Sequence, residues 1–255
     1  MRSDTPYDWP RIRDWRRQQR AALIERRVAV PRETLAPWNA AITESILAGF
    51  PMLAGMTIGF CWPFKHEFDA RFAIRRFRQQ GATAALPAVV EKTGPLQFRK
   101  WWPGAPMRPG VYDIPVPDGT EQVVPDAAIV PMNGFDEQGY RLGYGGGYFD
   151  RTLAAITPRP LAIGVGYEFA RLPTIHPQTH DIAMDFVVTE AGVHAVSGAR
   201  LTRLDPQACR ARARRLCDER RLPRPMRAED VGYSSPVCYA AEFPGYFGET
   251  ETDKK

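Results

Sequence analysis

The chain has no long apolar run, few cysteines and no leader-like N-terminus. No uninterrupted apolar stretch approaches the roughly 18 residues that a membrane-spanning helix requires. Residues 1–20 are charged and lack the apolar core of a signal peptide. The cysteines are scattered without paired spacing, which argues against a disulfide framework or a zinc site: Cys61, Cys209, Cys217 and Cys238. We therefore expect a cytoplasmic protein without a membrane partner.

Positive charge is concentrated in one part of the chain. The formal net charge is +5, and ten arginines lie between Ser197 and Arg227, opposed there by Asp205, Asp218 and Glu219. The remainder is close to neutral, so a nucleic-acid-binding function would rest on this basic stretch alone, and we do not expect a nucleic-acid partner. The 255 residues, with 44% hydrophobic and 25% charged content, fit one sizeable globular core with an appendage.

Glycine is abundant in a single stretch, Gly139–Arg151. A buried strand is expected before it, at Ala127–Pro131, and a helix after it, at Tyr148–Ile156. A strand, a glycine loop and a helix in this order direct backbone N–H groups and a helix N-terminus at an anion. Four glycines allow the backbone positive φ angles and close approach to a phosphate: Gly143, Gly145, Gly146 and Gly147.

Charged residues at both ends of this stretch fit the same chemistry. Arg141 and Arg151 can add charge-assisted hydrogen bonds to a phosphate. Asp150 is then left to hold a divalent cation between phosphate oxygens. The alternative is a glycine-rich turn with no ligand.

Two common nucleotide motifs do not fit. A P-loop requires a Lys-Ser or Lys-Thr pair after its last glycine, where this chain has Tyr148 and Phe149. A dinucleotide fingerprint that began at Gly143 and Gly145 would require its third glycine at Tyr148. The loop therefore indicates a different phosphate-binding arrangement.

The stretch from Arg141 to Arg151 reads Arg-Leu-Gly-x-Gly-x-Gly-Tyr-Phe-Asp-Arg, and it resembles the signature of the 5-formyltetrahydrofolate cyclo-ligase (methenyltetrahydrofolate synthetase) family. The similarity runs from about Trp15 to Glu190. It implies a ligase that uses ATP and Mg²⁺ to close 5-formyltetrahydrofolate, a reduced folate, to 5,10-methenyltetrahydrofolate, with release of ADP and phosphate. It implies catalytic roles for Arg141 and Tyr148. The implied ATP-binding residues are Arg16, Arg20, Arg141, Leu142, Gly143, Tyr144, Gly145, Gly146, Gly147, Tyr148 and Phe149.

The resemblance also implies a folate site and a metal site. An acidic residue of the family contacts the pterin, and Glu67 matches it, with Trp62 lining the pocket. Glu67 and Asp69 can alternatively cap a helix over Ala70–Gln80. The metal ligands implied are Asp150 and Asp185. The complete implied folate-binding set is Trp62, Glu67, Tyr144, Gly145, Gly146, Gly147 and Tyr148.

The chain departs from the family pattern at three positions. Arg16 stands where lysine is usual, Gln19 replaces a leucine, and Gly146 stands where some members have lysine. The changes at Arg16 and Gln19, together with the C-terminal extension, motivate an alternative function: a non-catalytic paralogue that binds a nucleotide or folate and has a regulatory or interaction role.

Short apolar strands that alternate with helices predict an α/β fold, with a mostly parallel central sheet flanked by helices in three layers. Ligands in such folds bind at the carboxyl ends of the strands. We expect a domain over residues 1–195 and an extension over 196–255. The extension combines a helix over Asp205–Arg221, capped by Asp205, with an aromatic segment, Val231–Phe247. The sequence leaves the oligomeric state open. The other expected elements are helices at Ile12–Val28 and Pro31–Ile46 and strands at Pro51–Cys61, Ala82–Val89, Leu161–Tyr167 and from Asp185.

Overall fold

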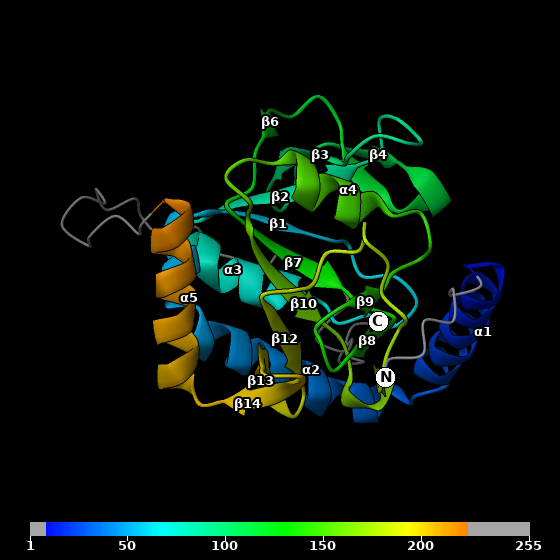
Figure 1. Cartoon of the computed structure of the whole chain (residues 1–255). Coiled ribbons are helices and arrows are strands. Elements are labelled where there is room, and N and C mark those ends of the chain that lie inside the picture. The colour runs from blue at the N-terminus through cyan, green and yellow to red at the C-terminus, as the bar shows by residue number, and fades with distance from the viewer. Residues whose placement is uncertain (1–8, 224–255) are drawn as a thin grey trace, which may run out of the picture.

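The computed structural model of the protein describes residues 9–223, and its centre is one large sheet (Figure 1). The sheet has nine strands in the order β14-β13-β12-β10-β7-β1-β2-β3-β6. Its five central strands pair in parallel. They are β12 (Phe186–Thr189), β10 (Leu161–Val165), β7 (Ala127–Pro131), β1 (Thr57–Phe60) and β2 (Thr83–Ala88).

The outer strands on both edges run antiparallel to their neighbours. One edge is formed by β13 (Gly192–Ser197) and β14 (Arg200–Leu204), the other by β3 (Gln97–Trp101) and β6 (Gln122–Val123). Two small sheets lie beside the large one. The first joins β4 (Met107–Pro109) to β5 (Pro115–Pro117), and the second has the order β11 (Arg171–Leu172), β8 (Gly134–Asp136) and β9 (Arg141–Leu142).

Helices and the small three-stranded sheet cover the two faces of the central sheet. Alternate residues of β7 point to opposite faces: Ala127 and Ile129 join one core cluster, whereas Ala128 and Val130 join another. The first cluster packs against α2 (Arg32–Gly49), α3 (Arg71–Gln79) and α5 (Pro206–Arg220). The second includes side chains from α1 (Trp9–Val28), α4 (Tyr148–Ala155) and the small sheet. The predicted three-layer α/β fold is confirmed.

The expected strand over Pro51–Cys61 is shorter than predicted. Its first half is a 3₁₀ turn, η1 (Pro51–Gly55), and strand pairing begins at Thr57. Pro51 occupies the start of this turn, where its fixed φ and missing N–H are tolerated. Further 3₁₀ turns are η2 (Val111–Asp113) and η3 (Glu168–Ala170).

The C-terminal helix belongs to the same core as the central sheet. The Asp205 carboxylate caps α5 by accepting a hydrogen bond from the Ala208 N–H at 2.8 Å, as the sequence predicts. Cys209, Ala213 and Cys217 of this helix are buried with α2. The boundary expected after residue 195 falls inside β13. The aromatic segment at 231–247 lies outside the described residues.

Candidate active site

The glycine loop, residues 143–147, connects β9 to α4 at one end of the central sheet (Figure 1). The sequence predicts that β7 leads into this loop, but the β8–β9 hairpin lies between them. Residues Met132 and Asn133 follow the carboxyl end of β7, and Trp62 to Glu67 follow that of β1. The candidate folate residues and the loop therefore meet where ligands bind in parallel α/β sheets.

Residues 144–146 of the loop are exposed to solvent. Gly145 and Gly147 have φ values of +96° and +64°, a region that other residues rarely adopt. Gly147 is also the N-cap of α4, which has no side-chain cap. A Cβ atom at Gly143 would meet nothing within 4 Å. The loop thus presents free space beside a helix N-terminus, as an anion site requires.

Arg141 and Asp150 clamp the two ends of the loop. Arg141 donates from both terminal nitrogens to the two carboxylate oxygens of Asp150, at 3.1 and 3.2 Å. Asp150 also accepts a hydrogen bond from the Ile182 N–H at 3.0 Å. The Arg141 side chain is buried, and its guanidinium lies over the Phe149 ring. These two residues therefore fix the geometry of the loop, and Leu142 is buried in the core below it.

Tyr148 opens α4 beside the glycines. Its ring lies so close to the loop that a Cβ at Gly146 would approach it to 2.8 Å. The Arg151 guanidinium stacks on the same ring at 4.9 Å and donates a hydrogen bond to the Gly94 carbonyl. Tyr148 is thus placed next to the exposed loop backbone, and Arg151 holds its ring in position.

Arg20 contacts the loop from α1. Its Nε donates to the Gly143 carbonyl at 2.6 Å, and its guanidinium lies against Gly145. Burial and the neighbouring charge of Arg16 lower the pKa of Arg20. The predicted ATP-binding position of Arg20 is therefore beside the glycine loop.

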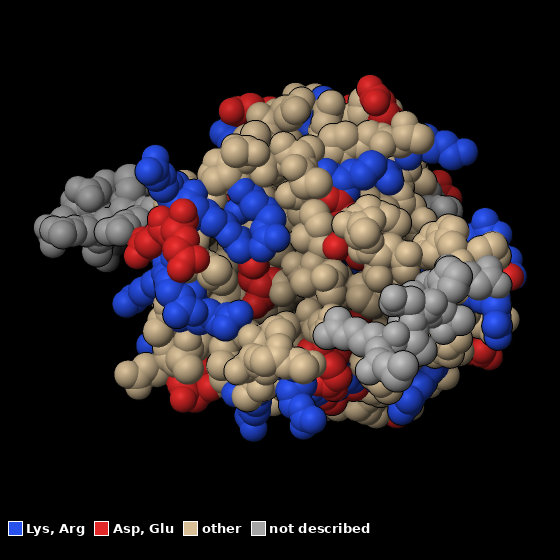
Figure 2. All heavy atoms as spheres, viewed as in Figure 1, with Lys and Arg blue, Asp and Glu red and all other residues tan. Residues whose placement is uncertain are grey.

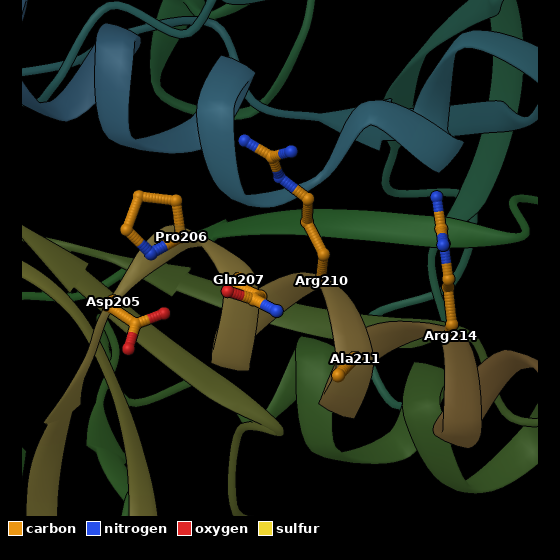
Figure 3. Close-up of a pocket in the computed structure, with 6 residues that line it drawn as sticks. All are labelled: Asp205, Pro206, Gln207, Arg210, Ala211 and Arg214. Atoms are coloured by element: carbon orange, nitrogen blue, oxygen red, sulfur yellow. The ribbon is translucent and has the colours of Figure 1, made fainter.

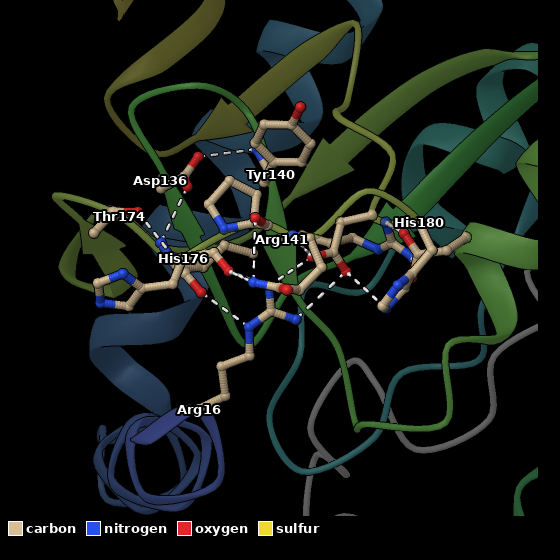
Figure 4. A network of polar contacts seen from close by, with 12 residues as sticks. Arg16, Asp136, Tyr140, Arg141, Thr174, His176 and His180 are labelled. Carbon is tan, nitrogen blue, oxygen red and sulfur yellow. Dashed lines mark hydrogen bonds and ion pairs between the residues drawn. The ribbon is translucent and has the colours of Figure 1, made fainter. Parts of the chain in front are cut away.

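Arg16 lies elsewhere (Figure 4). It rises from α1 into a loop and donates hydrogen bonds to the carbonyls of Ile175 and His176 at 2.9 and 2.8 Å. It also pairs with Asp181 at 2.5 Å, and both side chains are largely buried. Asp136 holds the same region by accepting the Ile175 N–H. Arg16 therefore anchors residues 175–181 and would have to leave these partners to reach a phosphate.

Glu67 lies at the centre of a buried polar network. Its Oε1 accepts a hydrogen bond from the Tyr144 hydroxyl at 2.8 Å, and its Oε2 accepts the Phe64 N–H at 3.1 Å. The Arg27 guanidinium lies 3.7 Å from Oε1. Burial raises the pKa of Glu67, whereas Arg27, Tyr144 and Phe64 lower it. Glu67 does not cap α3; Asp69 instead accepts the hydrogen bond from the backbone of Arg71.

Aromatic rings line the segment that leads to Glu67. Trp62 packs edge-on against Trp101 with 6.2 Å between ring centroids, and the Arg71 guanidinium lies 4.5 Å from the Trp62 ring. Phe64 lies 6.0 Å from Tyr144. Burial and the nearby Glu67 raise the pKa of the Cys61 thiol, which disfavours its thiolate form.

Asp185 has other partners than Asp150. It lies at the start of β12, where its carboxylate binds Arg159 at 2.8 Å, Arg220 at 2.6 Å and the Ala162 N–H at 2.8 Å. This is the amino end of the parallel strands. Residues 9–223 contain no group of three histidine, cysteine, aspartate or glutamate side chains placed to hold a metal ion. The structure therefore does not bring the two predicted magnesium ligands together, and arginines bind each carboxylate.

The sequence interpretation missed Arg27 as a site residue. Its side chain is 4% exposed and donates hydrogen bonds to the Lys65 carbonyl, the Asn133 amide oxygen and the Tyr144 hydroxyl, at 2.9, 2.9 and 3.0 Å. The spacing of the arginines along α1 could have indicated this role. Arg16, Arg20 and Arg27 lie on one helical face together with the buried Ile12 and Leu23.

A hollow along the first half of α5 shares no residue with this site (Figure 3). Asp205, Gln207 and Arg214 line it with Arg210, whose Nε donates to the Ala48 carbonyl at 2.8 Å near the end of α2. Figure 2 shows basic side chains gathered over α5, with acidic residues among them; those of α5 itself are arginines. Part of this charge therefore serves to attach α5 to α2.

Comparisons with known proteins identify the family to which the chain belongs. The profile of the 5-formyltetrahydrofolate cyclo-ligase family matches residues 12–190. The chain belongs to this family. Its β13–β14 hairpin and α5 follow the matched region.

Curated relatives carry the same family name. A 5-formyltetrahydrofolate cyclo-ligase of Mycolicibacterium smegmatis is 29% identical over 180 residues, which cover 68% of this chain and 92% of the relative. One of Escherichia coli K12 is 27% identical over 150 residues, which cover 56% and 82%.

Solved structures of the family share the fold. The 5,10-methenyltetrahydrofolate synthetase of Aquifex aeolicus superposes with a TM-score of 0.63 at 23% identity, covering 74% of this chain and 96% of that one. The enzyme from Mycoplasma pneumoniae gives a TM-score of 0.57 at 22% identity, covering 69% and 98%. Within residues 9–223, no helix is both long and apolar enough to cross a membrane.

Proposed function

We propose that this chain closes 5-formyltetrahydrofolate to 5,10-methenyltetrahydrofolate at the expense of ATP. Membership of the cyclo-ligase family supports the reaction. The observation that carries it is that one glycine loop reaches both sides of the site. Gly143 of this loop bonds Arg20, and the next residue, Tyr144, bonds Glu67.

The chemistry explains the need for ATP. The formyl oxygen is a poor leaving group, so it first attacks the γ-phosphorus and displaces ADP, which gives an imidate phosphate. Nitrogen 10 then attacks the formyl carbon and loses its proton, while the C–O bond breaks and phosphate leaves. The protein's work in such a reaction is positioning and neutralising charge on the phosphoryl group. No residue of the site has to act as a general base.

The nucleotide side of the site is assigned to the glycine loop and its neighbours. The backbone of the exposed residues 144–146 and the N-terminus of α4 can bind the phosphates, with Arg20 beside them. Arg141 positions this loop through Asp150, and Tyr148 lies against it. Arg16 is proposed as an anchor of residues 175–181, because its donors are already used there.

The folate side is assigned to Glu67 and Trp62. A carboxylate pairs well with adjacent N–H donors such as those of a pterin ring, and an indole can line the ring face. Glu67 bonds Tyr144 and Phe64, so these two contacts set the orientation of its carboxylate.

Magnesium would enter as the usual companion of ATP and would neutralise phosphate charge. Asp150 and Asp185 do not fit a shared magnesium site in the observed arrangement, so no step is assigned to that pair. We place the reaction in the cytoplasm, since Cys61, Cys209 and Cys217 are free thiols, as in a reducing compartment.

The test is a direct assay. Purified full-length protein is mixed with 5-formyltetrahydrofolate, ATP and Mg²⁺, and the absorbance of methenyltetrahydrofolate is followed, with an ATP-free reaction as control. ATP-dependent product is expected. Binding of ATP or folate in calorimetry without any product would instead identify a non-catalytic binding protein, and absence of both binding and product would reject the proposed function.

A further inference from the structure

Tyr144 joins two parts of the candidate site that are far apart in sequence. Its backbone belongs to the exposed middle of the glycine loop, and 42% of the residue is accessible. Its hydroxyl nevertheless reaches a buried environment, where it donates to Glu67 at 2.8 Å and accepts from Arg27 at 3.0 Å. Burial raises the pKa of Tyr144, so the hydroxyl keeps its proton and remains a donor.

The two ends of this link differ in their exposure to solvent. Glu67 and Arg27 side chains are 5% and 4% exposed, and Arg27 has further bonds to Lys65 and Asn133. The loop at the other end is accessible over residues 144–146. Tyr144 is therefore the contact through which the exposed glycine loop acts on the buried carboxylate of Glu67.

We propose that Tyr144 is a positioning residue that couples the two substrate sites, so that a nucleotide on the glycine loop strengthens folate binding at Glu67. The inference rests on the proposed function. A phosphate that binds the loop backbone restrains residue 144, and the restrained hydroxyl holds Oε1 of Glu67 in its orientation. A carboxylate oxygen has more than one acceptor site, so Tyr144 leaves room for a pterin N–H. Linkage requires that folate strengthen nucleotide binding by the same factor.

The experiment measures binding without turnover. The affinity of the full-length protein for 5-formyltetrahydrofolate is determined by calorimetry with and without a non-hydrolysable ATP analogue and Mg²⁺. The reverse titration measures the analogue with and without folate. We expect each ligand to tighten the other about fivefold, at the low end of measured coupling between sites.

Tyr144→Phe removes the hydroxyl and retains the ring that packs near Phe64. In this variant both ligands should still bind separately, but the coupling factor should fall to about one in both directions. Tyr140→Phe is the matched control, because it removes a tyrosine hydroxyl just before the loop but neither of these two bonds, and it should keep the parent's coupling.

The outcomes separate the inference from the proposed function. If the parent binds neither ligand, the proposed function fails and the inference with it. If the parent binds both ligands but shows no mutual tightening, or if Tyr144→Phe keeps the full factor, the function stands and the coupling role of Tyr144 is wrong. Thermal unfolding of each variant checks that its fold is intact.

Discussion

Asp150 and Asp185 are both paired with arginine, yet the two pairs lie at different ends of the sheet and do different things. The Arg141–Asp150 pair closes the base of a loop whose glycine backbone stays exposed. Asp185 is 6% exposed and binds Arg159 and Arg220, which attaches the end of α5 to the amino ends of β10 and β12. The Arg141–Asp150 pair shapes an exposed loop, whereas the pairs of Asp185 hold a packed contact between α5 and the sheet.

The difference shows what decides the role of an aspartate in this fold. A carboxylate with all its oxygens bound by guanidinium groups and N–H donors has little capacity left for a cation. At the carboxyl ends of the strands the neighbouring backbone offers free donors, so a ligand can bind beside the pair. At the amino ends the neighbours are packed side chains. Substitutions at the two pairs should therefore affect different quantities.

The largest effect is expected for Asp150→Asn. The asparagine side chain is neutral and has one acceptor oxygen, whereas the Asp150 carboxylate accepts two bonds from the guanidinium group. Arg141 is therefore left with an unpaired charge, and the two ends of the loop separate. Turnover should fall on the order of 100-fold or more, because a small displacement of groups that position a reaction is this costly. Initial rates of methenyltetrahydrofolate formation measure the loss.

The control for this variant is Asp14→Asn, which removes an exposed carboxylate paired with Arg17 on α1. It should turn over like the parent. Far-UV circular dichroism must show that the Asp150 variant is folded. Unchanged turnover in folded Asp150→Asn would contradict the clamp and equally a metal-binding role for this residue.

A tenfold effect is expected for Arg27→Gln, at the buried end of the open site. Removing a charged hydrogen-bond partner of Glu67 and Tyr144 should weaken folate binding by about tenfold, since such bonds contribute roughly 1.5–3 kcal/mol. Arg26→Gln is the matched control, because the neighbouring guanidinium stacks on Phe169 instead. The Michaelis constant for folate distinguishes the two variants, and equal constants would remove Arg27 from the site.

The same variant, Arg27→Gln, should also change the pH dependence of kcat/KM. Burial raises the pKa of Glu67 above that of an unfolded glutamate, and Arg27 gives the largest opposing effect. The ionised carboxylate, and folate affinity with it, is therefore lost as pH falls through the raised pKa. In Arg27→Gln the acid limb of kcat/KM should move to higher pH, and in Tyr144→Phe it should move the same way by less. A limb that stays in place would show that Glu67 does not govern binding.

The contribution of Glu67 to folding stability depends on pH in the opposite direction to its contribution to folate binding. A carboxyl group with a raised folded pKa binds its proton more tightly when folded. Its contribution to stability is therefore greatest below the unfolded pKa and declines as pH rises through the folded pKa. This residue favours folding at acid pH but favours binding at higher pH, which is typical of a buried group kept for function.

Local patterns predicted the frame of the molecule well. The strand at Ala127–Pro131 and the helix from Pro206 follow from an apolar run and from an Asp-Pro cap, signals that tertiary contacts only reinforce. The 3₁₀ turn before Thr57 was missed because an apolar, glycine-punctuated run does not distinguish it from a strand. The β8–β9 hairpin was missed because its strands are only three and two residues long.

The site was predictable in its residues but not in its partners. The glycine signature located the loop, yet nothing local shows that Arg16 binds residues 175–181 whereas Arg20 binds the loop. These pairings span more than 120 residues of sequence and depend on where α1 packs. The same limit applies to Asp185, because its partner Arg220 lies beyond the region that matches the family.

Arg220→Met tests the packed amino end of the sheet, where Asp185 lies, and the quantity measured is stability. The change removes two bonds to Asp185 and one to the Pro160 carbonyl, while Arg159 remains. We expect a loss of about 2–3 kcal/mol in unfolding free energy, less than the roughly 3–5 kcal/mol of a wholly broken buried pair. Urea unfolding gives the value, and Arg215→Met, on the exposed side of α5, should lose little.

Turnover per folded molecule decides what the Arg220 result means. It should match the parent, because α5 packs against α2, β10 and β14, and Arg220 binds at the amino ends of the strands. A large loss of turnover at unchanged stability would instead link the Asp185 end to the chemistry and bring back the predicted metal role. Asp150 and Asp185 would then both act in the reaction, and the contrast between a site residue and a packing residue would be wrong.

The smallest effects are expected from two glycines of the loop. Gly145→Ala places a Cβ 3.2 Å from the Arg20 guanidinium at φ +96°, so it should cost about 1–2 kcal/mol of stability as well as ATP affinity. Gly143→Ala meets nothing within 4 Å in the free protein, and its stability should be equal or slightly higher. If phosphate fills that open space, the Michaelis constant of Gly143→Ala for ATP rises roughly fivefold, equivalent to about 1 kcal/mol. Unchanged ATP kinetics in this variant would place the phosphates elsewhere, since the added methyl group would then lie in space that no ligand needs.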